Sequence, residues 1–322
     1  MENLKPSIVI LDSYAANPGD LSWEALASRG RLTIHEHLPE KEEELIARAK
    51  DAEILLINKA RLTGKILQQL PKLKYISILA TGYDVVDTAA AKELGILVSN
   101  TPSYSRDSVV QHVFALILEH YAKAGSHAHA VRMGKWAESP DFSFTLSPLT
   151  ELAGKTMGIV GMGNIGRKTA EVARAFGMNV LAATRTPVEV PGVTFLPLEE
   201  LLAGSDIVSL HCPLTPATKE LINKKTLSLM KKNALLINTG RGGLIDEKAL
   251  AEALESGEIM GAALDVLSSE PPPEDHPLTR LPNCIITPHI AWATKEARAR
   301  LLAIAEENVK NFLAGTPINL VG

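Results

Sequence analysis

Residues 157–166 read Met-Gly-Ile-Val-Gly-Met-Gly-Asn-Ile-Gly, and this stretch decides the fold. Its apolar start predicts a buried strand, after which Gly161, Gly163 and Gly166 form the pattern G-x-G-x-x-G. The apolar periodicity of residues 165–176 predicts that a helix follows. Glycine at the three positions allows, in turn, a tight turn, a close approach of the backbone to a pyrophosphate, and close packing of helix on sheet. The stretch therefore predicts a dinucleotide-binding site.

The start of that helix and the strand after it extend the prediction. Asn164 and Ile165 open the helix, where unpaired N–H groups and the positive end of the helix dipole favour a phosphate. A second strand is predicted at residues 179–183, at the spacing of a dinucleotide-binding unit. The alternative is a glycine-rich turn without a ligand, because the glycine pattern alone is weak. Its place between a strand and a helix favours dinucleotide binding.

The composition argues against several classes of protein. The chain has 322 residues, 46% of them hydrophobic and 22% charged, which suits about two globular domains. A formal net charge of -4 without a basic block argues against nucleic acid, and no apolar run approaches the ~20 residues that span a membrane. Residues 1–6 hold no signal core, and Cys212 and Cys284 lie far apart in or beside apolar runs. We predict a cytoplasmic protein with buried thiols and no metal site.

The first part of the chain alternates between strand and helix patterns. The predicted strands are Ser7–Leu11, Arg31–His35, Ala52–Ile57, Lys74–Leu79 and Ile96–Val98. The predicted helices are Leu21–Ser28, Lys41–Lys50, Thr63–Leu70 and Thr88–Leu94. Such alternation is typical of a doubly wound parallel sheet, and it predicts a small α/β domain that ends at about residue 100.

The middle of the chain differs from both ends. A helical pattern runs from Ser105 to about Met133, and its length and apolar content predict one long helix packed at a domain or subunit junction. Residues 134–150 lack a clear period and contain Trp136 and Phe142, so we predict an extended arm. Exposed aromatic side chains on an arm would suit a contact in a homodimer, and a loop that covers its own core is the alternative.

The glycine motif opens a second α/β run. The predicted strands are Met157–Val160, Asn179–Ala183, Val193–Leu196, Ile207–Leu210, Ala234–Asn238, Gly261–Val266 and Cys284–Thr287. The predicted helices are Leu198–Ala203, Lys224–Met230, Glu247–Glu255 with Asp246 as its N-cap, and Thr294–Leu313. The last helix follows the final strand of the second run and could return to pack on the first domain.

Three ionisable residues follow strands of the second run. Arg241, Glu270 and His289 each lie at or near the carboxyl end of a predicted strand, where open α/β sheets bind ligands. Histidine suits proton transfer, a neighbouring carboxylate would orient the imidazole, and arginine suits bidentate capture of a carboxylate. Each residue alone has a structural alternative: a hydrogen-bonded histidine, a capping or ion-pairing arginine, and a solvated loop carboxylate. Their shared position after strands of one sheet favours a catalytic role.

Four stretches together resemble the D-isomer-specific 2-hydroxyacid dehydrogenases. They are the glycine motif, Leu235-Leu-Ile-Asn-Thr-Gly-Arg-Gly-Gly243, the segment from Asp265 to Glu270-Pro271, and Thr287-Pro-His-Ile-Ala-Trp292. The resemblance covers essentially the whole chain. It implies a Rossmann dinucleotide-binding domain at residues 101–290, inserted in a flavodoxin-like substrate domain at 1–100 and 291–322, with the active site in the cleft.

The resemblance also implies roles for particular residues. Arg241 would anchor the substrate and polarise its carbonyl, His289 would be the acid or base, and Glu270 would orient His289. A carboxylate at Glu270 makes the formate dehydrogenase branch, which carries Gln there, less fitting. The loop Ala80-Thr-Gly-Tyr-Asp84 resembles the loop whose amides bind the substrate carboxylate, with an ordinary turn as the alternative.

Further positions follow from the same resemblance. Those implied around the substrate are Asn58, Lys59, Thr81, Gly82, Arg241 and Trp292, the last of which could equally be a core aromatic. Those implied around the dinucleotide, besides the glycine loop, are Val109, Thr184, Arg185, Thr186, His211, Cys212, Pro213, Asn238, Thr239, Gly240 and Asp265.

One departure bears on the cofactor. A carboxylate usually ends the second strand of enzymes that bind NAD, where it bonds the ribose hydroxyls, but here the stretch is Ala183-Thr-Arg-Thr186. A carboxylate would repel a 2′-phosphate, whereas Arg185 between two hydroxyls could bind one. We therefore predict NAD(H) or NADP(H) as cofactor, with a preference for NADP(H).

These observations predict an NAD(P)H-dependent reductase of small 2-keto acids. Within the family the motifs look most like those of the glycerate dehydrogenase branch, which implies hydroxypyruvate or glyoxylate as the substrate. Phosphoglycerate dehydrogenase fits less well, because many members carry a further C-terminal domain and this chain stops soon after its last helix. A dinucleotide-sensing binding module, like the corepressors built on this fold, is the alternative from another class.

Overall fold

A computed structural model describes residues 5–186 and 189–322. Residues 1–4, which form most of the stretch predicted to lack a signal core, lie outside this description, as do residues 187 and 188. The chain divides into two compact units, one formed by residues up to Ser105 together with Trp292–Gly322 and the other by Arg106–Ala291. The boundaries between the units fall after residues 105 and 291, close to the predicted domain boundaries after residues 100 and 290.

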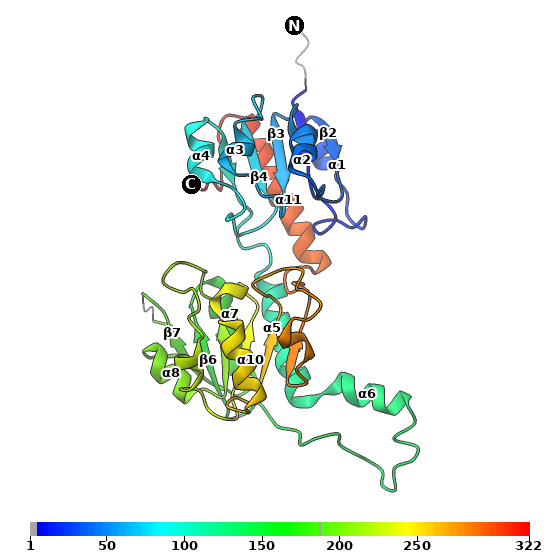
Figure 1. Cartoon of the computed structure of the whole chain (residues 1–322), viewed down its shortest axis with the longest axis vertical. Helices are drawn as coiled ribbons and strands as arrows, with labels where there is room; N and C mark the ends of the chain where they lie inside the picture. The colour runs from blue at the N-terminus through cyan, green and yellow to red at the C-terminus, as the bar shows by residue number, and fades with distance from the viewer. Residues whose placement is uncertain (1–4, 187–188) are drawn as a thin grey trace. The chain divides into compact units, whose positions relative to one another are not determined.

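The first unit is built on a five-stranded, all-parallel sheet in the order β2-β1-β3-β4-β5, of which β2, β3 and β4 are labelled in Figure 1. The strands are β1 (Ser7–Ile10), β2 (Arg31–Ile34), β3 (Ile54–Ile57), β4 (Tyr75–Ile78) and β5 (Leu97–Ser99). This is the flavodoxin-like order. The inner strands β3 and β4 are buried at every position, which requires apolar cover on both faces of the sheet.

Helices supply that cover. They are α1 (Glu24–Ala27), α2 (Glu42–Ala49), α3 (Gly64–Leu67), α4 (Thr88–Glu93) and α11 (Lys295–Leu313). The C-terminal helix α11 packs on β4, where the rings of Tyr75 and Phe312 stack with centroids 4.3 Å apart. Thr294 caps α11 by accepting from the Ala297 amide. The last helix thus completes the core that the first hundred residues begin.

The second unit holds a seven-stranded parallel sheet in the order β12-β11-β10-β9-β6-β7-β8. The strands are β6 (Thr156–Val160), β7 (Asn179–Ala183), β8 (Thr194–Phe195), β9 (Ile207–Leu210), β10 (Leu235–Asn238), β11 (Gly261–Leu264) and β12 (Cys284–Ile286). Counted from β6, six of these strands follow the dinucleotide-binding order 3-2-1-4-5-6, and β12 extends the edge. The order reverses between β6 and β9, so the glycine loop after β6 lies at the topological switch point.

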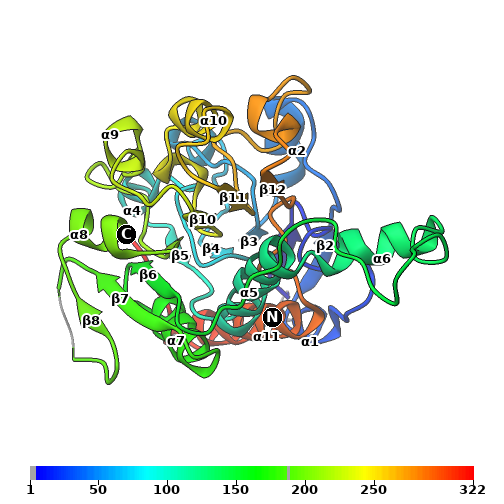
Figure 2. The same ribbon diagram turned by 90° about the horizontal axis from the view of Figure 1, so that it is seen from below.

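Two apolar cores lie on opposite faces of this sheet. One face is covered by α5 (Arg106–Ala122) and α7 (Asn164–Ala175), and the other by α8 (Leu198–Gly204), α9 (Lys224–Leu227) and α10 (Glu247–Glu255) (Figure 2). Asp246 caps α10 by accepting from the Ala249 amide, as the sequence predicts. Short 3-10 turns lie at Gly242–Leu244 and Pro277–Arg280. Within the described residues, no helix is long and apolar enough to cross a membrane.

The prediction of one long helix from Ser105 to Met133 is wrong. The helix ends at Ala122, Lys123 takes a left-handed conformation with φ of 50°, and α6 (Ala124–Arg132) begins in a new direction. The Glu119 carboxylate accepts from the Gly125 amide and so supplies a partner for the start of α6. The arm at residues 134–150 that follows α6 has neither helix nor strand.

Candidate active site

The fold itself requires glycine at two of the three glycine positions in the loop after β6. Gly161 has φ of +100°, and a Cβ there would lie 2.7 Å from the backbone of His211 and Cys212. A Cβ at Gly166 would lie 2.0 Å from the carbonyl oxygen of Gly161. Both positions therefore exclude any side chain, because β6, β9 and α7 meet there in backbone contact.

Gly163 differs, because a Cβ at this position would meet nothing within 4 Å. Its backbone caps the N-terminus of α7, and Gly163 and Asn164 are exposed. Packing within the described chain does not explain a glycine here, whereas a close-lying pyrophosphate would. The hydroxyl of Thr239, after the end of β10 and two strands along the sheet from β6, is buried without a hydrogen-bond partner among the described residues. Both observations fit a dinucleotide.

The end of β7 carries the side chains that bear on cofactor choice. Thr184 is half-buried, and Arg185 and Thr186 are exposed directly after the strand. The described stretch from Ala183 to Thr186 offers hydroxyls and a guanidinium at the place where NAD enzymes usually present a carboxylate.

The loop after β9 places His211, Cys212 and Pro213 next to the glycine loop. The His211 amide donates to the Val160 carbonyl at 2.7 Å, and its Nε2 lies 2.9 Å from the Ser209 hydroxyl. Burial lowers the pKa of His211 to about 4, so the imidazole is neutral at neutral pH. Burial likewise raises the pKa of the Cys212 thiol, so this sulfur is not a ready nucleophile. The loop presents a neutral surface.

Asn238, fully buried at the end of β10, shapes the turn that leads to Arg241. Its side chain accepts from the Gly240 amide at 3.0 Å and donates to the Arg241 carbonyl at 2.9 Å. Arg241 is half-buried and its guanidinium donates to the Gly240 carbonyl. A Cβ on Gly242 would lie 2.0 Å from the Leu267 backbone, so the loops after β10 and β11 touch here.

Asp265, directly after β11, binds the turn that carries His289. Its carboxylate accepts from the Thr287 hydroxyl at 2.6 Å and from the amides of Ile290 and Ala291 at 2.9 and 2.8 Å. Burial raises the pKa of Asp265, but the hydrogen bonds from His112, Thr287 and the two amides outweigh it and hold the pKa below its usual value. Asp265 is therefore a buried, ionised anchor.

Glu270 and His289 form a direct pair. The Nδ1 atom of His289 lies 2.6 Å from Glu270 Oε2, and Glu270 Oε1 accepts from the Leu267 amide at 3.1 Å. Because an ionised carboxylate only accepts, Nδ1 carries the hydrogen and Nε2 is left for another partner. Both side chains are partly exposed. The arrangement can move a proton at Nε2 while Glu270 stabilises the charged ring.

The structure brings the three candidate catalytic residues to one edge. Strands β10, β11 and β12 are neighbours in parallel register, so the segments that carry Arg241, Glu270 and His289 leave the sheet at the same end. Val109 is buried on α5 in the same unit. Trp292 belongs to the first unit, where its ring packs edge-on against Tyr104.

In the first unit, the predicted substrate loop is tied to the chain after β5. The Thr81 hydroxyl donates to the Thr101 carbonyl at 2.9 Å, and Asn100 donates to the Thr81 carbonyl at 2.7 Å. Gly82 is half-buried within this loop. Asn58 donates to the Leu79 carbonyl at 3.0 Å, so the loop after β3 is joined to the start of the loop after β4.

Sequence reasoning missed Asp12, which organises these loops. Its buried carboxylate, after β1, accepts from the consecutive amides of Asn58, Lys59 and Ala60. Burial raises the pKa of Asp12 above its usual value despite those hydrogen bonds. Its partners lie more than forty positions away in the sequence, so no local motif marks it.

A second pair that sequence reasoning missed supports the Glu270 loop. Glu247, the first residue of α10, accepts from the Ser268 amide at 2.6 Å and lies 3.1 Å from His276 Nε2. No group of three or more potential ligands is arranged to hold a metal ion in the part of the chain that the structure describes.

Comparison with known proteins gives consistent matches. A family model described as "D-isomer specific 2-hydroxyacid dehydrogenase, NAD binding domain" matches residues 114–291. The chain is 45% identical over 318 residues to a hydroxypyruvate reductase of Blautia hydrogenotrophica, covering 98% of this chain and 99% of the relative. It is 44% identical over 281 residues to a glycerate dehydrogenase of Methylorubrum extorquens, covering 87% and 88%.

A solved structure extends the comparison to three dimensions. An NADPH-dependent glyoxylate/hydroxypyruvate reductase from Sinorhizobium meliloti, in complex with NADP and malonate, matches with a TM-score of 0.85 and 29% identity. The match covers 99% of this chain and 97% of that chain. Similarity thus extends over both units.

Proposed function

The chain belongs to the D-isomer-specific 2-hydroxyacid dehydrogenase family, and on that premise we propose that it reduces hydroxypyruvate to D-glycerate, with glyoxylate as a second substrate. It is an NAD(P)-dependent oxidoreductase that acts on the CH–OH group of 2-hydroxy acids. The names of the relatives at 45% and 44% identity support the proposed substrate. The Glu270–His289 pair at 2.6 Å is the observation that carries the chemistry.

The roles proposed for the chain's residues follow from that pair. When bound, the nicotinamide supplies the hydride for reduction or accepts it in oxidation. His289 donates the proton from Nε2 to the keto oxygen in reduction and takes it back in oxidation, while Glu270 stabilises the imidazolium. Arg241 binds the substrate carboxylate and polarises the neighbouring carbonyl.

We propose that the dinucleotide lies along the carboxyl edge of the second unit's sheet. The open space at Gly163 and the N-terminus of α7 support a pyrophosphate there, and the unpartnered Thr239 hydroxyl supports a polar ligand group beside β10. The remaining residues proposed to line this site are Val109, Ile165, His211, Cys212, Pro213, Asn238, Gly240 and Asp265. The side chains of Thr184, Arg185 and Thr186 favour a 2′-phosphate, so we propose NADPH as the preferred cofactor.

In the first unit, we propose that the loop at Thr81 and Gly82 binds the substrate carboxylate through its backbone amides. Asn58 and Lys59 are proposed to contribute from the loop after β3, and Trp292 to shape the substrate pocket. The hydrogen bonds that join these loops to each other and to Asp12 support a rigid binding surface.

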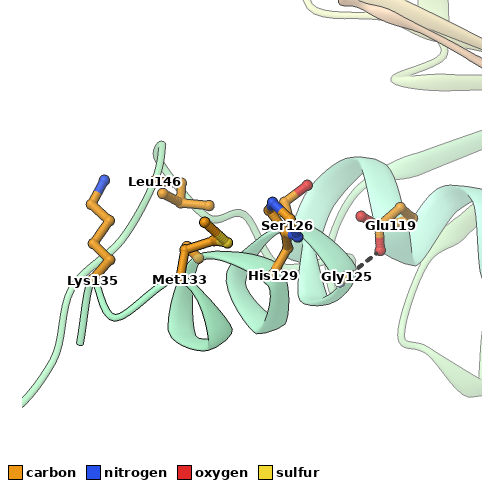
Figure 3. A pocket seen from close by; sticks show the side chains of 8 residues that line it. Glu119, Gly125, Ser126, His129, Met133, Lys135 and Leu146 are labelled. Carbon is orange, nitrogen blue, oxygen red and sulfur yellow. Dashed lines mark hydrogen bonds between the residues drawn. The ribbon is translucent and has the colours of Figure 1, made fainter. Parts of the chain in front are cut away.

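We propose further that the protein is a homodimer that uses α6 and the arm. Helix α6 buries none of its residues, yet a nine-residue helix is marginal alone and needs a packing partner. Met133 is 71% exposed and Phe142 is 86% exposed. Figure 3 shows Met133 and Leu146 beside His129 along the groove between α6 and the returning arm. A second copy of the chain is the occupant that a closed two-fold contact would supply.

The substrate proposal is tested by measuring kcat/KM for hydroxypyruvate, glyoxylate and pyruvate with NADH and NADPH in parallel. Hydroxypyruvate should give the highest kcat/KM, and kcat/KM should be higher with NADPH than with NADH. A kcat/KM that is highest with pyruvate would contradict the proposed substrate but not the family assignment. A strong NADH preference would contradict the cofactor proposal, and Arg185→Ala should lower kcat/KM with NADPH by about tenfold while sparing NADH.

A further inference from the structure

The turn that carries His289 has a backbone that must be held in place. His289 has φ of 55°, in the left-handed region that a residue with a side chain seldom adopts. Its amide donates to the carbonyl of Asp265 at 2.8 Å and to that of Thr287 at 2.9 Å. The direction of the imidazole therefore depends on the hydrogen bonds that fix residues 287–291.

The Asp265 carboxylate is the centre of those hydrogen bonds. Asp265 is 1% exposed, so its charge must be balanced by donors. Three of its donors belong to the turn itself: the Thr287 hydroxyl and the amides of Ile290 and Ala291. The carboxylate can accept only, so the Thr287 hydroxyl hydrogen points at Asp265 and the lone pairs of that oxygen remain free.

A histidine on helix α5 donates a hydrogen bond to the Thr287 hydroxyl oxygen. His112 Nε2 lies 2.9 Å from the Thr287 hydroxyl oxygen and 3.4 Å from Asp265 Oδ1. Since that hydroxyl already donates to Asp265, His112 must be the donor. One turn earlier on the same helix face, the Ser108 hydroxyl donates to the Ala291 carbonyl at 2.6 Å. Helix α5 thus holds both ends of the turn.

We propose that His112 is a positioning residue for proton transfer by His289. Its Nε2–H, acting through the Thr287 hydroxyl and the Asp265 carboxylate, fixes the turn at residues 287–291 and so aims the His289 imidazole. The side chains of His112, Thr287 and Asp265 thus form a hydrogen-bonded chain from α5 to the loop after β11. This chain holds the turn from which His289 reaches Glu270. The inference rests on the acid–base role proposed for His289.

The test compares His112→Leu with His112→Gln, because the side-chain amide nitrogen of Gln can replace the Nε2–H donor. His112→Leu should lower kcat by about 10- to 100-fold, as a small misplacement of a catalytic group does. The KM for hydroxypyruvate should stay within about twofold, because Arg241 is untouched. His112→Gln should restore most of kcat. In the enzyme without ligands, hydrogen exchange at the amides of His289 and Ile290 should become faster in His112→Leu.

A matched control separates positioning from general loss of stability. His120 is another partly buried histidine on α5, and its ring packs beside Tyr121 and Gly261. His120→Leu should lower the melting temperature and leave kcat near that of the wild type. Thr287→Val removes the hydroxyl and keeps His112, so it should reproduce the kcat loss of His112→Leu and serves if that variant does not fold.

Three outcomes would overturn the proposal. They are wild-type kcat in His112→Leu, no rescue by Gln, or an equal kcat loss in His120→Leu. His289→Gln, measured in parallel, separates this failure from that of the proposed function. If His289→Gln is inactive and His112→Leu is normal, the positioning role fails alone. If His289→Gln keeps near-normal kcat, the acid–base role itself fails.

Discussion

Gly163 is a residue whose identity the fold does not explain. Its φ and ψ of -73° and -164° are open to any residue, and a Cβ would point into empty space. We expect Gly163→Ala to fold with an unchanged melting temperature and to bind dinucleotide at least about tenfold more weakly, because the methyl group would occupy the place of the pyrophosphate. Thermal melting and a fluorescence titration with NADPH measure the two effects.

The neighbouring glycine provides the control for this variant. Gly166→Ala places a methyl group 2.0 Å from the Gly161 carbonyl oxygen, so it should lower the melting temperature sharply even without ligand. Wild-type NADPH affinity in Gly163→Ala would show that no phosphate approaches this part of the loop.

The half-buried His211 should couple stability to pH. Burial lowers its folded-state pKa from 6.5 to about 4, so between these values the unfolded chain binds a proton that the folded chain does not. The free energy of unfolding therefore falls as pH falls through this range. From pH 7 to pH 5, the wild type should lose about 2 kcal/mol more than His211→Asn, as urea unfolding at both pH values would show. Equal losses in both proteins would mean that His211 is solvated.

The sequence predicts where a candidate residue lies when that residue directly follows a strand. Arg241, Glu270 and His289 each follow a strand of the second run, so their placement at one edge follows from the parallel sheet alone. No local sequence pattern identifies Asp12 or His112. Their partners lie 46 and 175 positions away, and a side chain's distant partner is set by tertiary packing.

At the scale of elements, the alternation of strands and helices was predictable and the break in the middle helix was not. Ala122, Lys123 and Ala124 are good helix formers, and Gly125 is the one weak helix former beside the break, which is too little to locate it. The left-handed conformation of Lys123 is accompanied by the hydrogen bond from the Gly125 amide to Glu119, which spans the break. The same limit applies to helix ends: α1 is Glu24–Ala27 rather than Leu21–Ser28, and the Ser22 hydroxyl accepts from the Glu24 amide in the turn before the helix.

The loops of the first unit give a prediction at this scale. Asp12 holds three consecutive amides of the loop after β3, and Asn58 joins that loop to the one after β4. Asp12→Asn replaces one acceptor oxygen with a donor that faces those amides. We expect the KM for hydroxypyruvate to rise about tenfold, while the Kd for NADPH is unchanged because its proposed contacts lie in the other unit.

An exposed aspartate of the same unit serves as the control. Asp51 forms a surface ion pair with Lys72, and Asp51→Asn should change neither constant, because exposed pairs contribute little. A rise in NADPH Kd as large as that in KM would contradict this prediction, because it would show that the effect of Asp12→Asn is not confined to the loops of the first unit.

At the scale of the whole molecule, the order of strands carries more information than their positions. Each sheet reverses its order once, beside β1 in the first unit and beside β6 in the second, and such a reversal marks where ligands bind. The sequence predicts parallel sheets from alternation, but the order follows only from the family resemblance. Within the first unit, α11 shows that the end of the chain completes the core begun by its start.

The exposed apolar surface of α6 and the arm gives the prediction for the assembly. If a second copy covers it, the wild type should have twice the chain mass of 34.6 kDa in light scattering after gel filtration. Met133→Glu combined with Phe142→Glu should reduce that mass to one chain, because two carboxylates would be buried at each copy of the contact. Leu94→Glu, at a residue of the first unit that is 44% exposed, should leave the mass unchanged.

Other results would contradict different parts of the homodimer proposal. A wild type with the mass of one chain would contradict the homodimer. A double variant that stays a dimer would move the contact away from the arm, and the apolar groove between α5 and α7, lined by Val110, Phe114 and Val172, would become the surface to substitute next. Loss of activity together with loss of the dimer would show that the active site needs the second copy, because neither Met133 nor Phe142 lies among the residues proposed to bind ligands.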